Sequence, residues 1–348
     1  MVVEIAGKKI GAGHPCFVIA EAGVNHNGNL EMARRLIDVA KESGADAVKF
    51  QTFKADRLAI PSAPKARYQL ETTDEKESQQ EMLRRLELSE KDHRELMAYC
   101  RKQKMLFLST PFDEESADLL QKLEVPAFKI PSGELTHLLF LRHVARYGRP
   151  MIVSTGMATL SEVQEAVRAI REVSQEGLIL LHCVSSYPAD PADVNLRAMQ
   201  TMASTFHCPA GYSDHTVGLT AALAAVAIGA CVIEKHFTLD KGLPGPDHRA
   251  SMEPQELKSL VREIRIVEAA LGNGRKEPTR AEAETAAVAR KSLVAARDIP
   301  AGSRLTQDLI AAKRPGTGLP PSMLELVVGK TAKRDIGEGT LLELEMLG

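Results

Sequence analysis

The chain has few cysteines, and they follow no regular pattern. Its 348 residues contain five, an odd number with no C-x-x-C pair, at positions 16, 100, 183, 208 and 231. This excludes a disulfide framework and favours reduced thiols in a cytoplasmic protein. The N-terminus has no basic stretch before an apolar core, and no apolar run approaches the roughly 18 residues that cross a bilayer. We therefore expect a cytoplasmic protein with no membrane partner.

A strong net charge is also missing. Lysine and arginine number 44 against 46 aspartate and glutamate, which gives a formal net charge of −2. So weak a field does not favour nucleic acid as a partner. Apolar residues make up 44% and charged residues 26%, a composition typical of a globular protein with ample core material.

The chain lacks a G-x-G-x-x-G after a strand, the fingerprint of an open dinucleotide-binding sheet. It shows instead a regular alternation of short apolar runs with helical patterns up to Leu271. The predicted strands are residues 16–21, 45–51, 105–110, 127–130, 151–155, 178–183, 209–213 and 231–236. Eight strand–helix units favour a (β/α)8 TIM barrel, with an open doubly wound sheet as the alternative.

Helical patterns cover residues 30–44, 93–104, 114–124, 160–174, 218–230 and 254–271. Asp113 and Ser161 are candidate N-caps, and Gly44 is placed to end the first helix. Residues 51–89 are longer than an ordinary strand-to-helix connection, so we expect this insertion to lie over the barrel mouth as a lid.

The pattern changes after Leu271. Residues 272–284 are polar and are interpreted as a linker, which makes residues 1–271 the barrel domain. Residues 285–348 contain short β-like runs and two similar phrases, DIPAGSRL and DIGEGTLL. They predict a small, mostly β domain that is marginal alone and is expected to pack on another surface.

Polar residues stand at the ends of seven of the eight predicted strands. Barrel enzymes carry their active sites at these carboxyl ends, whereas branched apolar side chains normally fill the interior. With a period of two, the inward-facing polar positions are Glu21, Lys49, Gln51, Thr110, Lys129, Ser154, Ser213, His215, Glu234 and His236. This rim predicts an active site.

The rim and its neighbours divide into two chemical groups. Cations and hydroxyls suited to a phosphate dianion are Lys49, Thr110, Lys129, Ser132, Ser154 and Ser213. Groups suited to a polyol, a carbonyl or a metal are Glu21, Gln51, Glu134, Tyr187, His215, His236 and Asp247. We therefore expect a phosphorylated small molecule beside a hydroxylated one.

Two histidines end neighbouring predicted strands and could share a divalent ion. His215 and His236 would leave positions for water and substrate, which suits a Lewis acid. The alternative is one acid–base histidine with a structural neighbour. Glu234 lies on the strand face of His236, and we expect it to orient that ring. Lys129 also has an alternative, a Schiff-base role.

The same residues lie in motifs that resemble the sialic acid synthase family over nearly the whole chain. The motifs are IAEAGVNHNGN, DAVKFQTF, FLSTPFD, FKIPSGE, IVSTGM, LHCVSSYPA, GYSDHTVG, IEKHFTLD, GPDHRAS and KRPGTGL. Members of that family condense phosphoenolpyruvate with a 2-acetamido sugar aldehyde. They have a barrel followed by an antifreeze-like (SAF) domain.

The resemblance implies a role for each group of residues. Phosphoenolpyruvate would be bound by Lys49, Thr110, Lys129, Ser132, Ser154 and Ser213, and a metal, usually manganese, by His215 and His236. The sugar would contact Glu21, Gln51, Asp74, Tyr187, Asp247 and Arg314. As a separate mechanistic hypothesis, we expect Glu134 to manage the proton of the attacking water and Glu21 to help orient the sugar. Family dimers exchange their small domains, so Arg314 would come from the partner of a homodimer.

Two positions depart from the family pattern. Asp74 stands about where N-acetylneuraminate synthases carry asparagine, and Ser185 stands where some members of the family have it, so the identity of the sugar is open. N-acetylmannosamine is the first expectation, and a 2,4-diacetamido sugar for legionaminic or pseudaminic acid is the alternative. More distant alternatives are an aldolase that uses Lys129 as an imine, and a non-catalytic sugar-binding protein.

Overall fold

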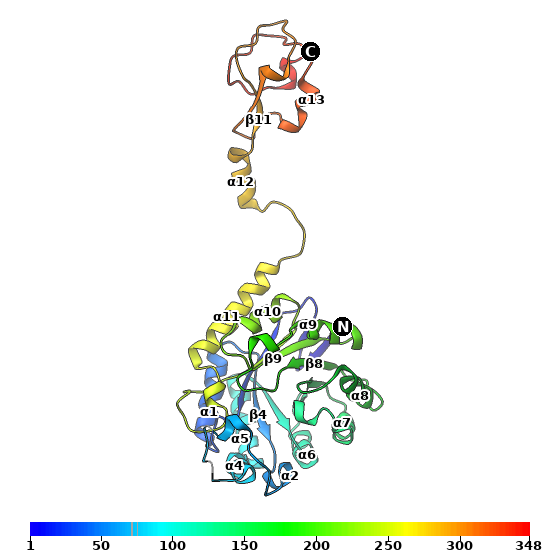
Figure 1. The fold of residues 1–348 in the computed structure, drawn as a ribbon, viewed down its shortest axis with the longest axis vertical. Helices are drawn as coiled ribbons and strands as arrows, with labels where there is room; N and C mark the ends of the chain where they lie inside the picture. The colour runs from blue at the N-terminus through cyan, green and yellow to red at the C-terminus, as the bar shows by residue number, and fades with distance from the viewer. Residues whose placement is uncertain (71, 75) are drawn as a thin grey trace. The chain divides into compact units, whose positions relative to one another are not determined.

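The computed structural model describes residues 1–70, 72–74 and 76–348, which form two compact units (Figure 1). The first unit is Met1–Gly272 and the second is Asn273–Gly348. The predicted lid, residues 51–89, includes positions 71 and 75, which lie outside the described residues. Helix α12 (Arg280–Ala289) overlaps the end of the predicted linker and belongs to the second unit.

Eight parallel strands form the sheet of the first unit. They are β3 (Phe17–Gly23), β4 (Ala47–Thr52), β5 (Leu106–Pro111), β6 (Phe128–Ile130), β7 (Met151–Ser154), β8 (Leu178–Cys183), β9 (Ala210–Asp214) and β10 (Val232–His236). Their order is β5-β4-β3-β10-β9-β8-β7-β6, and β5 lies beside β6, which closes the ring. Each strand agrees with its prediction to within two residues at both ends. The (β/α)8 prediction is confirmed, and the open-sheet alternative is wrong.

Eight main helices alternate with these strands. They are α1 (Leu30–Glu42), α5 (Glu90–Gln103), α6 (Glu114–Lys122), α7 (Leu138–Ala145), α8 (Leu160–Arg171), α9 (Arg197–Phe206), α10 (Thr220–Ala227) and α11 (Pro254–Leu271). Their apolar faces pack on the outward strand residues, as Leu36 and Ile37 do beside Val18 and Val48. In the part of the chain the structure describes, no helix is long and apolar enough to cross a membrane.

The predicted helix caps are correct in one case and wrong in another. Asp113 caps α6 and accepts a hydrogen bond from the backbone N–H of Ser116. Helix α8 is capped by Thr159 instead of Ser161. Glu162 explains the difference, because it returns a contact to the backbone N–H of Thr159 and completes a capping box.

A hairpin that the sequence analysis did not predict precedes the barrel. Strands β1 (Val2–Ile5) and β2 (Lys8–Gly11) pair antiparallel. Val3, Ile5 and Ile10 are buried and pack with the deepest inward-facing apolar residues of the barrel strands. The hairpin thus covers the N-terminal end of the barrel with apolar side chains and leaves the polar end for the site.

In its described residues, the insertion after β4 contains three short helices: α2 (Ala55–Leu58), α3 (Arg67–Leu70) and α4 (Gln79–Leu86). A small core of Val24, Phe53, Met82 and Leu86 anchors it to the barrel. Several of its side chains line the cavity at the carboxyl ends of the strands, where the predicted lid was expected.

The second unit contains an antiparallel strand pair, β11 (Ser292–Ala295) with β12 (Ile310–Lys313). The two similar phrases, residues 298–305 and 335–342, lie outside these strands and contact each other. Ile299 and Ile336, from the two phrases, exchange backbone hydrogen bonds. Asp335 accepts from the backbone N–H of Ala301 at 2.7 Å, and Asp298 from that of Glu338 at 2.8 Å. The apparent sequence repeat is therefore a structural repeat around one apolar core.

Candidate active site

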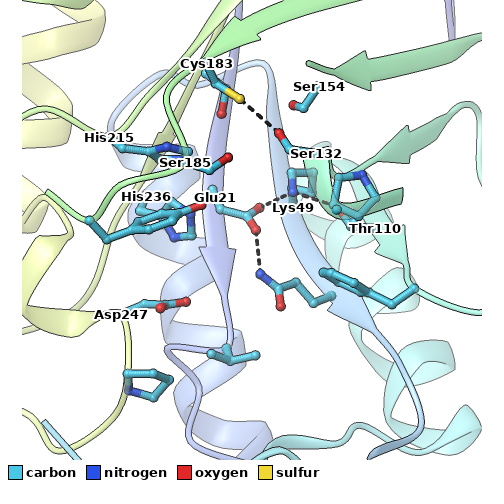
Figure 2. A pocket seen from close by; sticks show the side chains of 18 of the residues that line it. Glu21, Lys49, Thr110, Ser132, Ser154, Cys183, Ser185, His215, His236 and Asp247 are labelled. Atoms are coloured by element: carbon cyan, nitrogen blue, oxygen red, sulfur yellow. Dashed lines mark hydrogen bonds and ion pairs between the residues drawn. The ribbon is translucent and has the colours of Figure 1, made fainter. Parts of the chain in front are cut away.

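A cavity of about 420 Å³ opens at the carboxyl ends of the barrel strands (Figure 2). Most of the predicted site residues line it. These are Glu21, Lys49, Gln51, Thr110, Lys129, Ser132, Ser154, Tyr187, Ser213, His215, His236 and Asp247. The strand pattern explains the arrangement, because the deeper polar residues follow a buried apolar residue by two positions. These are Glu21, Lys49, Thr110, Lys129, Ser154 and Glu234. Gln51 and His236 lie two residues further along the same strand faces. The barrel interior is thus apolar toward the N-terminal ends of the strands and polar toward their carboxyl ends.

The structure places three predicted site residues away from the cavity lining. Glu134 ends a short 3-10 turn, and its carboxylate lies 3.0 Å from Nδ1 of His137. Asp74 is exposed on the insertion, where its carboxylate accepts from the backbone N–H of Lys76. Arg314 lies in the second unit and donates to the backbone oxygen of Ala289 at 3.0 Å.

Two lysines and two glutamates form a buried charge cluster at the base of the cavity. Lys49 Nζ lies 2.8 Å from Glu21 Oε2 and 3.8 Å from Glu234 Oε2. Lys129 Nζ lies 3.3 Å from Glu234 Oε1. The expectation that Glu234 orients His236 is wrong, because this carboxylate sits between the two ammonium groups and accepts from Ser213 Oγ at 3.1 Å.

Hydroxyl groups extend the charge cluster toward the cavity. Lys49 donates to Thr110 Oγ1 and Lys129 donates to Ser154 Oγ, each at 2.8 Å. The four charged side chains are no more than 5% exposed, so they must compensate one another. Cations fixed among hydroxyl donors are the groups that hold a phosphate.

The pKa values of the two carboxylates shift in opposite directions. Burial raises the pKa of Glu21, although the neighbouring Lys49 acts in the opposite direction. Burial would also raise the pKa of Glu234, but Lys129 and Lys49 together hold it below its usual value. Glu234 is therefore the ionised partner that both lysines share.

His215 and His236 both line the cavity, and both have a lowered pKa that favours the neutral imidazole. Nδ1 of His215 donates to the backbone oxygen of Val184 at 2.7 Å, so its Nε2 carries the lone pair. Nδ1 of His236 is buried and makes no hydrogen bond with any residue the structure describes. Burial lowers the pKa of both imidazoles, and their ring centroids lie 5.7 Å apart.

Two neutral imidazoles with free lone pairs fit a divalent metal. Among residues 1–70, 72–74 and 76–348, no group of three or more histidine, cysteine, aspartate or glutamate residues is arranged to hold an ion. Tyr187 packs beside the pair, with its ring centroid 4.2 Å from that of His215.

Sequence reasoning missed three further residues of the site. Cys183 lies 3.0 Å from Ser132 Oγ, and the backbone N–H of Gly156 donates to the same hydroxyl at 3.0 Å. Ser185, noted only as a departure from the family pattern, also lines the cavity. Cys183 follows the inward-facing Leu181 by two, so the strand period could have identified it.

The segment after β3 positions the loop that carries Asp247. Asn27 donates through Nδ2 to the backbone oxygen of Pro244 at 2.8 Å. His248 lies within hydrogen-bond distance of Asn27 and Thr238, at 3.2 and 2.6 Å. Burial raises the pKa of Asp247 to about 6. The asparagine-rich motif therefore places this carboxyl group at the cavity.

The fold and this site agree with a known family. A family model described as the NeuB family matches residues 36–276. The chain belongs to the NeuB family. A second model, of the SAF domain, matches residues 290–348 of this NeuB-family chain. The resemblance stated from the motifs, and the antifreeze-like domain that it implied, are confirmed.

Named relatives are acid synthases, so this NeuB-family chain is an enzyme of that type. It is 49% identical to the N,N'-diacetyllegionaminic acid synthase of Legionella pneumophila, covering 96% of this chain and 95% of the relative. It is 38% identical to the human N-acetylneuraminate-9-phosphate synthase, covering 98% and 95%. The crystal structure of an N-acetylneuraminic acid synthetase from Leptospira borgpetersenii has a TM-score of 0.73 at 37% identity, covering 82% and 95%.

Gly156 generates a prediction about the site. An added Cβ there would lie 2.8 Å from Cys183 Sγ and from Ser132 Oγ, and closer still to Ser185 Oγ. We expect Gly156→Ala to displace these side chains and lower synthase kcat/KM by at least about tenfold, the cost of about 1.4 kcal/mol in transition-state binding.

Gly133 offers a matched control. It lines the same cavity, but an added Cβ meets no atom within 4 Å. Gly133→Ala should therefore keep kcat/KM within about twofold of the original chain, roughly 0.4 kcal/mol. Steady-state kinetics of both variants would make the comparison, and equal activity of the two would contradict it.

Proposed function

We propose that this NeuB-family enzyme condenses phosphoenolpyruvate with a 2,4-diacetamido sugar aldehyde and water to give a nonulosonic acid and phosphate. The observation that carries the proposal is the buried lysine pair among hydroxyls, which lines one cavity with two histidines and a group of polar residues suited to a sugar. Groups suited to bind a phosphate, the lysines and hydroxyls, thus share one cavity with groups suited to bind an aldehyde carbonyl, the histidines.

The choice of sugar differs from the first expectation. N-acetylmannosamine came first from the sequence, with the diacetamido sugar as the alternative. The relative at 49% identity is named for N,N'-diacetyllegionaminic acid, whereas the human N-acetylneuraminate-9-phosphate synthase is 38% identical. This difference in identity supports the diacetamido sugar. Asp74 and Ser185, which depart from the family pattern, leave that choice open from the sequence.

The reaction makes a carbon–carbon bond and then breaks a carbon–oxygen bond. C3 of phosphoenolpyruvate attacks the aldehyde carbon, water adds at C2, and phosphate leaves with the bridging oxygen. Lys49, Lys129 and their hydroxyl neighbours bind the phosphate group throughout. Glu21 and Gln51 orient the sugar from adjacent strands, with 3.4 Å between Gln51 Nε2 and Glu21 Oε1.

Glu134 is the proposed base for the attacking water. Glu134 directly follows Ser132 and Gly133, which line the cavity. Its carboxylate contacts the ring of His137 in this structure, so the side chain must turn away from that ring to reach the cavity. If Glu134→Gln releases phosphate at the unchanged rate, Glu134 does not have this role.

His215 and His236 would hold a divalent ion, manganese by family resemblance. The fit rests on the free Nε2 of His215 and the unpartnered, buried Nδ1 of His236. When bound, such an ion supplies a Lewis acid that stabilises negative charge on the aldehyde oxygen.

The function is tested by phosphate release from phosphoenolpyruvate. We expect release with a 2,4-diacetamido mannose, and less with N-acetylmannosamine or its 6-phosphate. Absence of release with every sugar would refute the synthase. Trapping of pyruvate on Lys129 by borohydride would instead identify the imine aldolase.

Metal removal gives an independent prediction. After treatment with a chelator, phosphate release should fall at least about tenfold and return when Mn2+ is added, because the aldehyde oxygen loses its Lewis acid. Mn2+ binding, measured by electron paramagnetic resonance, should be lost in His215→Ala and His236→Ala. Activity that is insensitive to the chelator would contradict the metal role.

We also propose the homodimer with exchanged small domains, in which Arg314 serves the partner's site. Arg314→Ala should then raise the KM for the sugar at least about tenfold, about 1.4 kcal/mol of lost binding, with little effect on the KM for phosphoenolpyruvate. Lys313 is an exposed neighbour, so Lys313→Ala is the control. An unchanged sugar KM in Arg314→Ala would contradict the exchange.

A further inference from the structure

One side of the cavity is apolar, whereas most of the remaining lining is polar. The residues of this side, called here the apolar wall, are Val24, Leu58, Met82, Leu83, Leu86 and Phe112. Three belong to α4 and one to α2, while Val24 and Phe112 directly follow β3 and β5. The apolar wall therefore stands over neighbouring strands β3, β4 and β5.

Strand β4 fixes the order of the groups along the depth of the cavity. Lys49 belongs to the buried charge cluster, and Gln51 faces the same interior two residues later, about 7 Å further along the strand. The insertion that carries most of the apolar wall begins just after Thr52. The cavity thus has a charged base, a polar middle level and an apolar upper side.

This order determines how a sugar lies in the cavity. Under the proposed function, on which this inference rests, the aldehyde carbon must meet phosphoenolpyruvate above the lysines. The far carbons of the open-chain sugar then extend toward the upper level. The substituents on these carbons then contact an apolar surface. Such a surface favours a methyl group, and it offers no hydrogen bond to a hydroxyl group that has lost its water.

We propose that the apolar wall selects the sugar by binding the methyl of its second acetamido group. Leu58 and Leu83 are only partly buried and line the cavity, so they can contact that methyl. Gln79 lines the same region and can pair with the amide of the group. A hydroxyl in this place would lose water without gaining an apolar contact.

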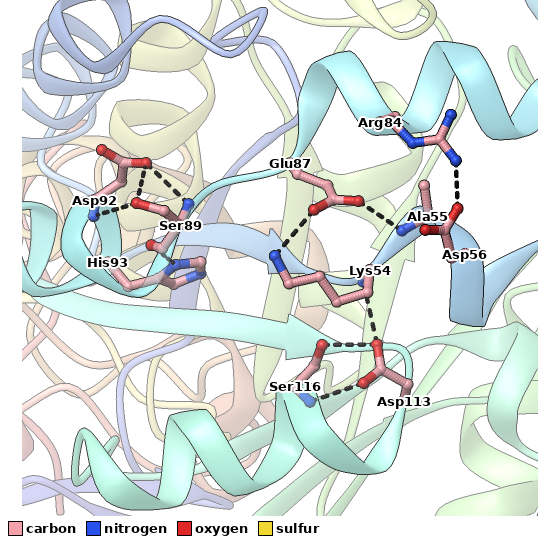
Figure 3. A network of polar contacts seen from close by, with 10 residues as sticks. All are labelled: Lys54, Ala55, Asp56, Arg84, Glu87, Ser89, Asp92, His93, Asp113 and Ser116. Carbon is pink, nitrogen blue, oxygen red and sulfur yellow. Dashed lines mark hydrogen bonds and ion pairs between the residues drawn. The ribbon is translucent and has the colours of Figure 1, made fainter.

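The apolar wall is held in place by polar contacts outside the cavity (Figure 3). Glu87 accepts from Lys54 Nζ at 2.9 Å and from the backbone N–H of Ala55 at 2.8 Å, which joins the two ends of the insertion. Arg84 of α4 pairs with Asp56 of α2. The wall is therefore formed before the sugar arrives, and binding need not order it.

Leu83→Asn tests the proposal, since it replaces an apolar contact with a polar group of similar size. We expect kcat/KM for the 2,4-diacetamido sugar to fall at least about tenfold, while that for N-acetylmannosamine stays within about threefold. The KM for phosphoenolpyruvate should not change, because its site lies at the base. Leu58→Asn should give the same pattern and provides a second variant if Leu83→Asn does not fold.

Leu70→Asn is the control, since Leu70 is 40% exposed on the same insertion and does not line the cavity. It should leave the ratio of kcat/KM values for the two sugars unchanged. An unchanged ratio in Leu83→Asn and Leu58→Asn, or an equal loss with both sugars, overturns the inference and leaves the synthase intact. If the unaltered chain acts on no sugar, the proposed function fails first, and this inference fails with it.

Discussion

The mutual neutralisation of two lysines and two glutamates at the barrel axis is the constraint on which the site depends. An isolated charge so deeply buried would cost several kcal/mol, so each member requires the others. Glu234 is central because it contacts both Lys129 and Lys49. A phosphate that enters this cluster finds cations already desolvated and fixed by hydroxyls, and little reorganisation remains to be done on binding.

The polar interior is possible because other parts of the barrel are strongly apolar. The hairpin closes the N-terminal end with Val3, Ile5 and Ile10, and the helices pack on the outward strand faces. Most strands therefore have three environments: apolar toward the helices, apolar at the inward start and polar at the inward end. A shift by one residue in any strand would exchange the inner and outer faces, so the fold and the site depend on the same register.

Much of this was predictable from the sequence, because the strand period of two is simple and the barrel repeats it. The period placed Glu21, Lys49 and Lys129 on one interior surface. It could not reveal the partner of each charge, so Glu234 was assigned to His236. The hairpin was missed because it lies outside the strand–helix alternation: its two strands pair antiparallel with no helix between them. The surroundings of Asp74 and Glu134 depend on turns and loop contacts that no periodicity encodes.

The bridge from Glu87 to Lys54 and Ala55 has a consequence for how the family can vary. It joins the two ends of the insertion at its base, in addition to the apolar contacts that Met82 and Leu86 make with Val24 and Phe53. Changing the length of the segment between these two ends then costs little closure entropy, since that cost grows only with the logarithm of loop length. The length and sequence of the insertion can therefore change to suit another sugar. The buried cluster of lysines and glutamates at the bottom of the cavity can stay the same.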